Sequence, residues 1–154
     1  MVKYKYILIL FLSIGLNAEL IKNSENYLSP ENISLDKEAL IYSVSASFNN
    51  ISLQSIKIEN PKKSNMGKYH TLSKKDKYAL SAINKEGKEI LLVGLGDPFY
   101  IHVDHIGYED SDIFGGYIDY EFEIAIPLSV EISHLVLLSQ NEFGLKEIKK
   151  IKVN

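Results

Sequence analysis

The chain has 154 residues, of which 45% are hydrophobic and 24% are charged, and it contains no cysteine. These values are typical of one soluble globular domain, and the lack of cysteine excludes disulfide frameworks, Cys-based zinc sites, thiol nucleophiles and acylation at a cysteine. All 17 basic residues are lysines and the formal net charge is −3. The composition therefore argues against nucleic acid as a partner, because arginine makes the best bidentate contacts with phosphates and bases.

The amino terminus has the three parts of a secretory signal peptide. Lys3 and Lys5 form a basic region, residues 7–16 are almost wholly apolar, and Ala18 is a small residue before a polar sequence. Ten helical residues rise only about 15 Å, roughly half of the hydrocarbon core of a bilayer. We therefore expect residues 1–18 to be a cleaved signal peptide and the mature protein to be periplasmic or secreted, with no stable membrane span. An uncleaved anchor and a buried core segment are the alternatives.

The remainder of the chain contains short apolar runs separated by polar turns. Residues 19–38 are polar and contain Ser29-Pro30, so we expect a linker or an irregular lead-in there. From residue 39 onward, apolar and polar side chains alternate with a period of two, which is typical of half-buried strands. The runs that alternate, or that are short and continuously apolar, are residues 40–48, 51–58, 78–82, 90–93, 99–103, 118–126 and 135–138.

Turn-forming residues separate these runs. Asn84-Lys85-Glu86-Gly87 is typical of a hairpin turn, Gly96 is expected to adopt a positive φ, and a phase slip near Ser55 indicates a β-bulge. Residues 145–153 fit a strand, with a short helix as the alternative. Seven or eight strands and no long helix predict an all-β domain over residues 39–154. We expect an antiparallel β-sandwich, with a closed barrel as the main alternative.

Three pieces of the chain, in order, carry a resemblance to a known family: residues 77–88, Gly96-Asp97-Pro98 and residues 122–128. The arrangement Tyr-x-Leu, Gly-Lys, Gly-Asp-Pro and Phe-x-Ile-x-Ile-Pro resembles immunoglobulin-like β-sandwich domains of bacterial secreted proteins. It is similar to the sandwich at the amino end of secreted IgA-peptidase-type metallopeptidases. The resemblance spans residues 40–153 and implies an immunoglobulin- or fibronectin-like sandwich that accompanies a catalytic domain without catalysis of its own.

One cluster has the composition of a transition-metal site. On a strand, His102 and Asp104 would project to one face, about 7 Å apart, and His105 could join them. Two imidazoles and a carboxylate can hold zinc or another transition metal, but a further ligand, such as His70 or His134, would have to converge. Solvent-exposed residues at the end of a strand explain the same cluster without a metal.

An acidic segment follows and contains Glu109, Asp110 and Asp112. Crowded carboxylates suit Ca²⁺, and Glu109 could also complete the transition-metal site, but the spacing is not that of an EF-hand loop. A solvated acidic loop is the simpler interpretation, so we expect no resident cofactor.

A lysine-rich loop spans residues 60–77. It could contact an anionic glycan, a lipid headgroup or an acidic partner, although a solvated loop has the same composition. The candidate binding residues in it are Lys62, Lys63, Lys68, Lys74 and Lys75.

The sequence contains no nucleophile motif or phosphate-binding loop, so we expect an exported, non-catalytic binding or accessory module of unknown ligand. Its expected contact surfaces are the loops at residues 60–77 and 104–116, and its expected partner is another exported or envelope protein. Two alternatives stay open. One is a small metal-dependent enzyme built on His102, Asp104 and His105, and the other is a structural subunit that pairs by β-strand addition.

Overall fold

The computed structural model of the chain describes residues 28–103 and 114–153. These two ranges contain ten β-strands, one short α-helix and one turn of 3₁₀-helix. All the sheets are antiparallel, so the all-β prediction is confirmed, whereas the expected number of seven or eight strands is too low. The count rises partly because β3 (His70–Thr71) has only two residues, too few to show a period in the sequence. No helix of the described ranges is long and apolar enough to cross a membrane.

One sheet contains three strands in the order β2-β1-β8. β1 (Ala39–Ser47) lies at its centre, between β2 (Asn50–Glu59) and β8 (Tyr120–Pro127). As the alternation in the sequence predicts, Val44 of β1 and Phe122 of β8 face inward and are almost fully buried. The period of two therefore sets which face of this sheet contacts the core.

The predicted bulge in β2 is also present. The register between β1 and β2 shifts between Ser43 and Val44, which pair with Ser55 and Leu53, so Gln54 has no partner on β1. An extra residue of this kind bends a strand and increases its local twist. The strand predicted over residues 118–126 begins two residues later than expected, at Tyr120, because Ile118 and Asp119 connect β7 (Phe114–Tyr117) to β8.

The other sheet contains five strands in the order β10-β9-β4-β5-β3. Its four longer strands are β4 (Tyr78–Ile83), β5 (Glu89–Gly96), β9 (His134–Asn141) and β10 (Gly144–Lys152). Gly87 and Gly144 stand in the hairpin turns with φ of 80° and 114°, which glycine adopts without a steric penalty. The last segment is a strand and not a helix, because it pairs with β9 along its length.

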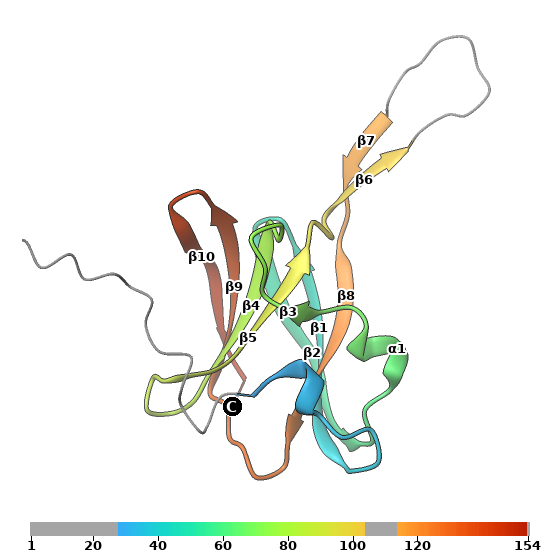
Figure 1. Ribbon diagram of the computed structural model, residues 1–154, viewed down its shortest axis with the longest axis vertical. Helices are drawn as coiled ribbons and strands as arrows, with labels where there is room; N and C mark the ends of the chain where they lie inside the picture. Colours follow the sequence, from blue (N-terminus) through green and yellow to red (C-terminus); the bar gives the residue numbers. More distant parts are fainter. Residues whose placement is uncertain (1–27, 104–113, 154) are drawn as a thin grey trace, which may run out of the picture.

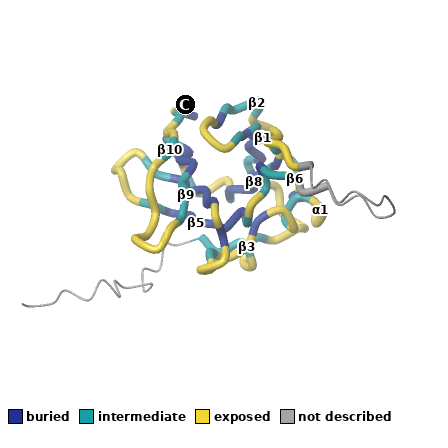
Figure 2. The backbone as a smooth tube through the Cα atoms, turned by 90° about the horizontal axis from the view of Figure 1, so that it is seen from above, coloured by how far each residue is buried: buried dark blue, intermediate teal, exposed yellow. Residues whose placement is uncertain are grey.

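The two sheets lie face to face and the main core lies between them (Figure 1). Leu80 and Leu137 of the larger sheet and Ile124 and Ile126 of the smaller sheet are fully buried there. Seen from above, the segments with buried residues lie toward the middle of the molecule and the exposed segments lie at its periphery (Figure 2). Burial of one such side chain stabilises a fold by about 1.5–3 kcal/mol, so packing can hold this sandwich together without disulfides.

Two smaller parts are attached to the sandwich. β6 (Tyr100–Val103) pairs with β7, and this two-stranded ribbon projects from one end of the sandwich (Figure 1). The second part is the segment that precedes β1: the backbone N–H of Leu28 donates to the carbonyl of Ile90 in β5 at 2.7 Å. The polar lead-in is therefore attached to the larger sheet from Leu28 onward.

The outward face of the three-stranded sheet is apolar at one end and polar at the other. At the apolar end, Ala39, Ile41 and Ala125 form a second buried cluster that packs against Ile33 and Met66. These two covering residues come from the ends of short elements: Ile33 follows η1 (Pro30–Asn32), and Met66 ends α1 (Lys63–Met66). The covering segments thereby leave the polar end of the sheet open.

Candidate functional site

The polar end of the three-stranded sheet is hollowed into a groove of about 340 Å³, which we call the outer-face groove. Strands β1, β2 and β8 form its floor, and residues around α1 form one wall. Its lining residues are Ser43, Val44, Gln54, Asn65, Lys68, Glu121, Phe122 and Glu123. Val44 and Phe122 point into the core, so their backbone alone faces the groove. The volume lies near the lower end of the range of about 300–1,000 Å³ that is typical of ligand pockets.

Glu123 is oriented by hydrogen bonds from two sides. The hydroxyl of Ser43 donates to its Oε1 at 3.3 Å, and the side-chain amide of Asn65 donates to its Oε2. These contacts join β1, β8 and α1 through a single half-buried carboxylate. These hydrogen bonds therefore hold the Glu123 carboxylate in one position in the groove.

Lys68 and Tyr69 cover the outer edge of β8 beside the groove. The ammonium of Lys68 donates to the carbonyl oxygen of Glu121 at 2.9 Å and lies 5.7 Å from the centre of the Tyr120 ring, where the ring attracts a cation. Burial raises the pKa of Tyr69 to about 12, although the hydrogen bond of its hydroxyl group with the backbone of Ala125 acts in the opposite direction. Both side chains bind the backbone of β8 and so fix the wall of the groove.

The side chains of the groove include hydrogen-bond donors and acceptors. The carboxylates of Glu121 and Glu123 accept, the ammonium of Lys68 donates, and the amides of Gln54 and Asn65 do both. A hydroxyl group also donates and accepts, so the groove suits a ligand with several hydroxyl groups. Within residues 28–103 and 114–153, no three His, Cys, Asp or Glu side chains lie close enough together to hold a metal ion.

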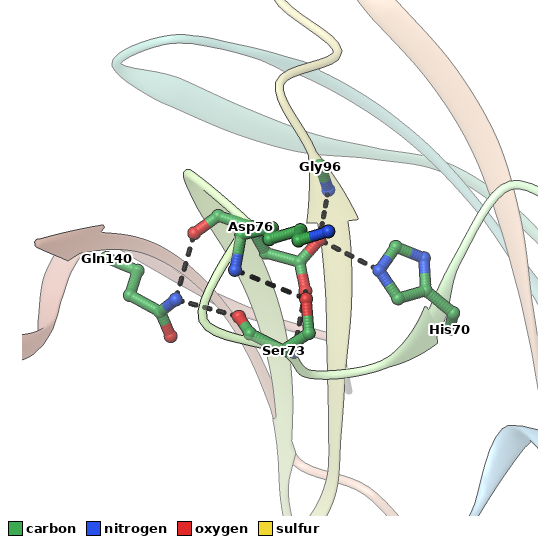
Figure 3. A network of polar contacts seen from close by, with 6 residues as sticks. His70, Ser73, Asp76, Gly96 and Gln140 are labelled. Carbon is green, nitrogen blue, oxygen red and sulfur yellow. Dashed lines mark hydrogen bonds and ion pairs between the residues drawn. The ribbon is translucent and has the colours of Figure 1, made fainter.

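A second polar cluster, which we call the Asp76 site, lies in the turn before β4. Asp76 is only 4% exposed, and its carboxylate accepts four hydrogen bonds (Figure 3). One oxygen accepts from the backbone N–H of Gly96 at 3.0 Å and lies 2.8 Å from Nε2 of His70, which donates because an ionised carboxylate only accepts. The other oxygen accepts from the backbone N–H and the hydroxyl of Ser73, at 2.7 and 3.0 Å.

The charge state of Asp76 follows from these contacts. Burial by itself would raise the pKa of Asp76, but the hydrogen bonds from Ser73 and His70 outweigh burial, and the pKa lies below its ordinary value. The side-chain amide of Gln140 donates to the carbonyl oxygens of Ser73 and Asp76, at 2.8 and 3.0 Å. The carboxylate thus fastens the turn to β5, and Gln140 fastens it to β9, which is a structural task.

The structure places the five lysines of the predicted binding loop on separate parts of the surface. Lys68 lines the outer-face groove, Lys63 is the first residue of α1, and Lys62 forms an exposed ion pair of 3.9 Å with Glu59 of β2. Lys74 and Lys75 are exposed in the turn that Asp76 stabilises. The loop contributes to two separate surfaces, and a binding role for these lysines stays a prediction.

Most of the predicted metal ligands lie outside the described residues. These are Asp104, His105, Glu109, Asp110 and Asp112. The backbone of His102 is part of β6. The other two histidines considered make local contacts. His70 contacts Asp76, and Nδ1 of His134 lies 2.9 Å from the hydroxyl of Ser133. The metal-dependent enzyme stays a hypothesis, which elemental analysis of the purified protein would test.

Sequence reasoning missed the groove because its residues come from four separate parts of the chain. The alternation in β8 identified Glu121 and Glu123 as outward-facing, and the serines of β1 are equally visible as an outward row. Nothing in the sequence indicates that β1 and β8 are neighbours, or that Asn65 reaches Glu123. A search for outward polar rows on two strands would have found the floor, though not the wall.

Exposed aromatic rings form another surface feature near the ribbon. Phe48, in the turn between β1 and β2, lies with its ring centre 4.6 Å from that of Tyr117, and these side chains are 43% and 62% exposed. The ring of Tyr100 lies 5.4 Å from the same tyrosine. The alternation over residues 40–48 predicts that Phe48 faces inward with Val44, but Phe48 follows the last residue of β1, where the alternation no longer applies.

Comparison of the chain with protein-family models, curated proteins and solved structures gave no match. The resemblance to immunoglobulin-like domains therefore stays a prediction from the sequence.

Proposed function

We propose that the chain is an exported, non-catalytic β-sandwich module that binds a small hydroxyl-rich ligand, and we favour a short oligosaccharide. The observation that carries the proposal is the outer-face groove, in which amides, carboxylates and one ammonium line a volume of about 340 Å³. Sugar hydroxyls donate to carboxylates and accept from amides and ammonium groups, so one ligand class satisfies all of these side chains. A purely apolar ligand would displace water from the donor and acceptor sites that these side chains have left without replacing its hydrogen bonds, at a cost in free energy.

The strand order of the larger sheet supports an immunoglobulin-like relationship. Counting the seven longest strands in sequence, β4, β9 and β10 are the third, sixth and seventh, and they are adjacent, as strands C, F and G are in immunoglobulin sandwiches. The smaller sheet departs from that pattern, because its first strand, β1, lies at the centre, whereas the immunoglobulin strand A lies at an edge. We therefore base the proposed immunoglobulin-like relationship on the strand order of the larger sheet.

Export is the other part of the proposal, and it rests on the basic, apolar and small residues of positions 1–18, which lie outside the described residues. The chain should be produced with its own amino terminus in a bacterial host and recovered from the periplasm or the medium. Mass spectrometry of the intact protein should give a chain that begins at Glu19. Recovery of only the uncleaved chain, in the membrane fraction, would contradict this part of the proposal.

Calorimetric titration of the purified protein with a panel of neutral, acidic and amino-sugar oligosaccharides tests the binding function. Gln54→Ala and Glu121→Gln change exposed groups of the groove and should weaken binding of the active oligosaccharide about tenfold, which corresponds to about 1.4 kcal/mol. Glu142→Gln, in the exposed turn before β10, is the matched control and should leave binding unchanged. The proposal fails if no oligosaccharide binds, or if both groove variants bind as the unaltered protein does.

A further inference from the structure

The edges of the two sheets are covered unequally. At the edge of β8, Lys68 and Tyr69 occupy backbone groups, and along β5 the short strand β3 pairs with Val93-Gly94. Within residues 28–103 and 114–153, no strand pairs with the outer side of β10, but this strand is rich in charge, which opposes pairing with another chain. Its charged residues are Lys146, Glu147, Lys149, Lys150 and Lys152.

The edge of β2 has much less of this protection. β2 has ten residues, contains no proline and carries two charges, Lys57 and Glu59. Among the described residues no strand pairs with its outer side, and the strand lies at the rim of the molecule (Figure 2). Ile56 and Ile58 are 41% and 59% exposed, although both are on the face that contacts the core. An unpaired strand edge with few charges and two exposed isoleucines is a template for another strand.

The bulge limits the part of β2 that can accept a strand. Gln54 interrupts the register with β1, and a bulge disrupts the regular row of backbone groups. From Ser55 to Glu59 the pairing with β1 is regular, and Pro61 follows two residues later. The regular edge is therefore the five-residue segment Ser55–Glu59.

We propose that residues 56–60, which comprise the end of this edge and Asn60, pair antiparallel with the same residues of a second copy of this chain, so that two three-stranded sheets join into one six-stranded sheet. The two-fold axis passes beside Ile58, which lies opposite Ile58 of the other copy. Residues opposite each other in an antiparallel pair share a face, so the isoleucines meet on the inner face. A symmetric dimer of this kind uses one self-complementary patch twice.

Charge complementarity selects the second copy and sets the register. With Ile58 opposite itself, Lys57 lies opposite Glu59 of the other copy, and the symmetry repeats this pair. A shift that puts Lys57 opposite itself would place two like charges across the strands, which is destabilising. Glu59 already has a partner within its own chain, Lys62 at 3.9 Å, but that pair is exposed and adds little stability. Glu59 can therefore turn to the other copy.

Charge reversal gives the first test. Sedimentation equilibrium of the purified protein, from about 1 μM to about 1 mM, should show a monomer–dimer equilibrium. Lys57→Glu and Glu59→Lys should each weaken the dimer about tenfold, because each makes both symmetric pairs repulsive. The double variant should restore the dimer, and Lys146→Glu on β10 should leave it unchanged. Circular dichroism checks that every variant is folded.

Cross-linking gives a second test that does not depend on charge. The chain has no cysteine, so Ile58→Cys would introduce a single thiol. Opposite Cβ atoms in an antiparallel pair lie about 4.5–5.5 Å apart, close to the separation in a disulfide. Mild oxidation should link this variant into a dimer, whereas Lys146→Cys should stay monomeric. A monomer at every concentration, or a double charge variant that does not recover, would overturn the inference. It is independent of the proposed oligosaccharide binding, which can fail while the dimer forms.

Discussion

The Asp76 site and the outer-face groove are built from nearly the same kinds of side chain, yet they differ in how those side chains are used. Each contains carboxylate, serine, amide and cationic or imidazole groups. The carboxylate of Asp76 is 4% exposed and accepts four hydrogen bonds from the protein. In the groove, Glu121 is exposed and Glu123 is half-buried with two such bonds.

The difference separates a structural role at Asp76 from the binding role that we propose for the groove. A buried carboxylate that the protein fully engages stabilises the fold and offers little to a ligand, whereas an exposed one has acceptor capacity left. Residue types alone do not distinguish the two, since a search for clusters of polar residues would find both. Substitutions that remove polar groups should therefore lower stability at the Asp76 site and ligand affinity at the groove.

The largest effect on stability is expected from Asp76→Asn. The substitution removes the charge that four donors share and points an amide nitrogen at some of them, so buried N–H groups lose their acceptors. Hydrogen bonds to charged groups are worth about 1.5–3 kcal/mol, and we expect the free energy of unfolding to fall by about 3 kcal/mol. Urea denaturation at neutral pH measures this loss. A loss below about 0.5 kcal/mol, the range of ordinary surface substitutions, would remove the contrast between the two sites.

Gly94→Ala should perturb the same site through a steric clash with the carboxylate. A Cβ atom at position 94 would lie 2.3 Å from Oδ2 of Asp76, which is closer than atoms can approach, so the carboxylate must move away from its donors. We expect a loss of about 2 kcal/mol in the free energy of unfolding. Gly116→Ala is the matched control, because nothing lies within 4 Å of the new atom there.

A double variant checks that the two residues act on each other. In Asp76→Ala the obstructing carboxylate is absent, so adding Gly94→Ala should cost at least about 1 kcal/mol less than it does in the unaltered protein. Simple additivity of the two losses would mean that Gly94 is required for a different reason.

The pH dependence of stability should also report on Asp76. Its pKa lies below the ordinary value of 3.8 in the folded state, so its contribution is fully present well above that value and is lost as the pH falls through the lower, folded-state pKa. The difference in unfolding free energy between the unaltered protein and Asp76→Asn should therefore be constant near neutral pH and shrink in acid below about pH 4. Urea denaturation from neutral pH to acid measures it, and a difference that grows in acid would contradict the assigned direction of the pKa.

The sequence predicts local features of the fold better than it predicts contacts between distant residues. The alternation of Val44 and Phe122 with polar neighbours predicts the inner face of the smaller sheet, because the period of a strand is a local property. The hairpin at Gly87 and the bulge near Ser55 are local for the same reason. Asp76 and Gln140, in contrast, are 64 residues apart in the chain, and their contact depends on the pairing of β4 with β9.

The second buried cluster shows a related limit. Ile41 and Ala125 occupy positions that alternation assigns to the outward, polar face, yet both are buried. They are covered because Ile33 and Met66, from segments with no periodic pattern, pack on that face. Where such cover ends, the groove begins, so the position of the candidate site depends on irregular segments that a periodic pattern does not describe.

The smallest effect on stability is expected from Glu121→Gln in the groove. Glu121 is exposed, and it is its backbone carbonyl, not its carboxylate, that accepts the hydrogen bond from Lys68. The substitution preserves the backbone contact and the shape of the side chain, so the free energy of unfolding should change by less than about 0.5 kcal/mol, as measured by urea denaturation. A loss of 2 kcal/mol or more would place Glu121 in the same structural class as Asp76. The groove would then be a part of the folded framework, and its carboxylates would have no capacity left for a ligand.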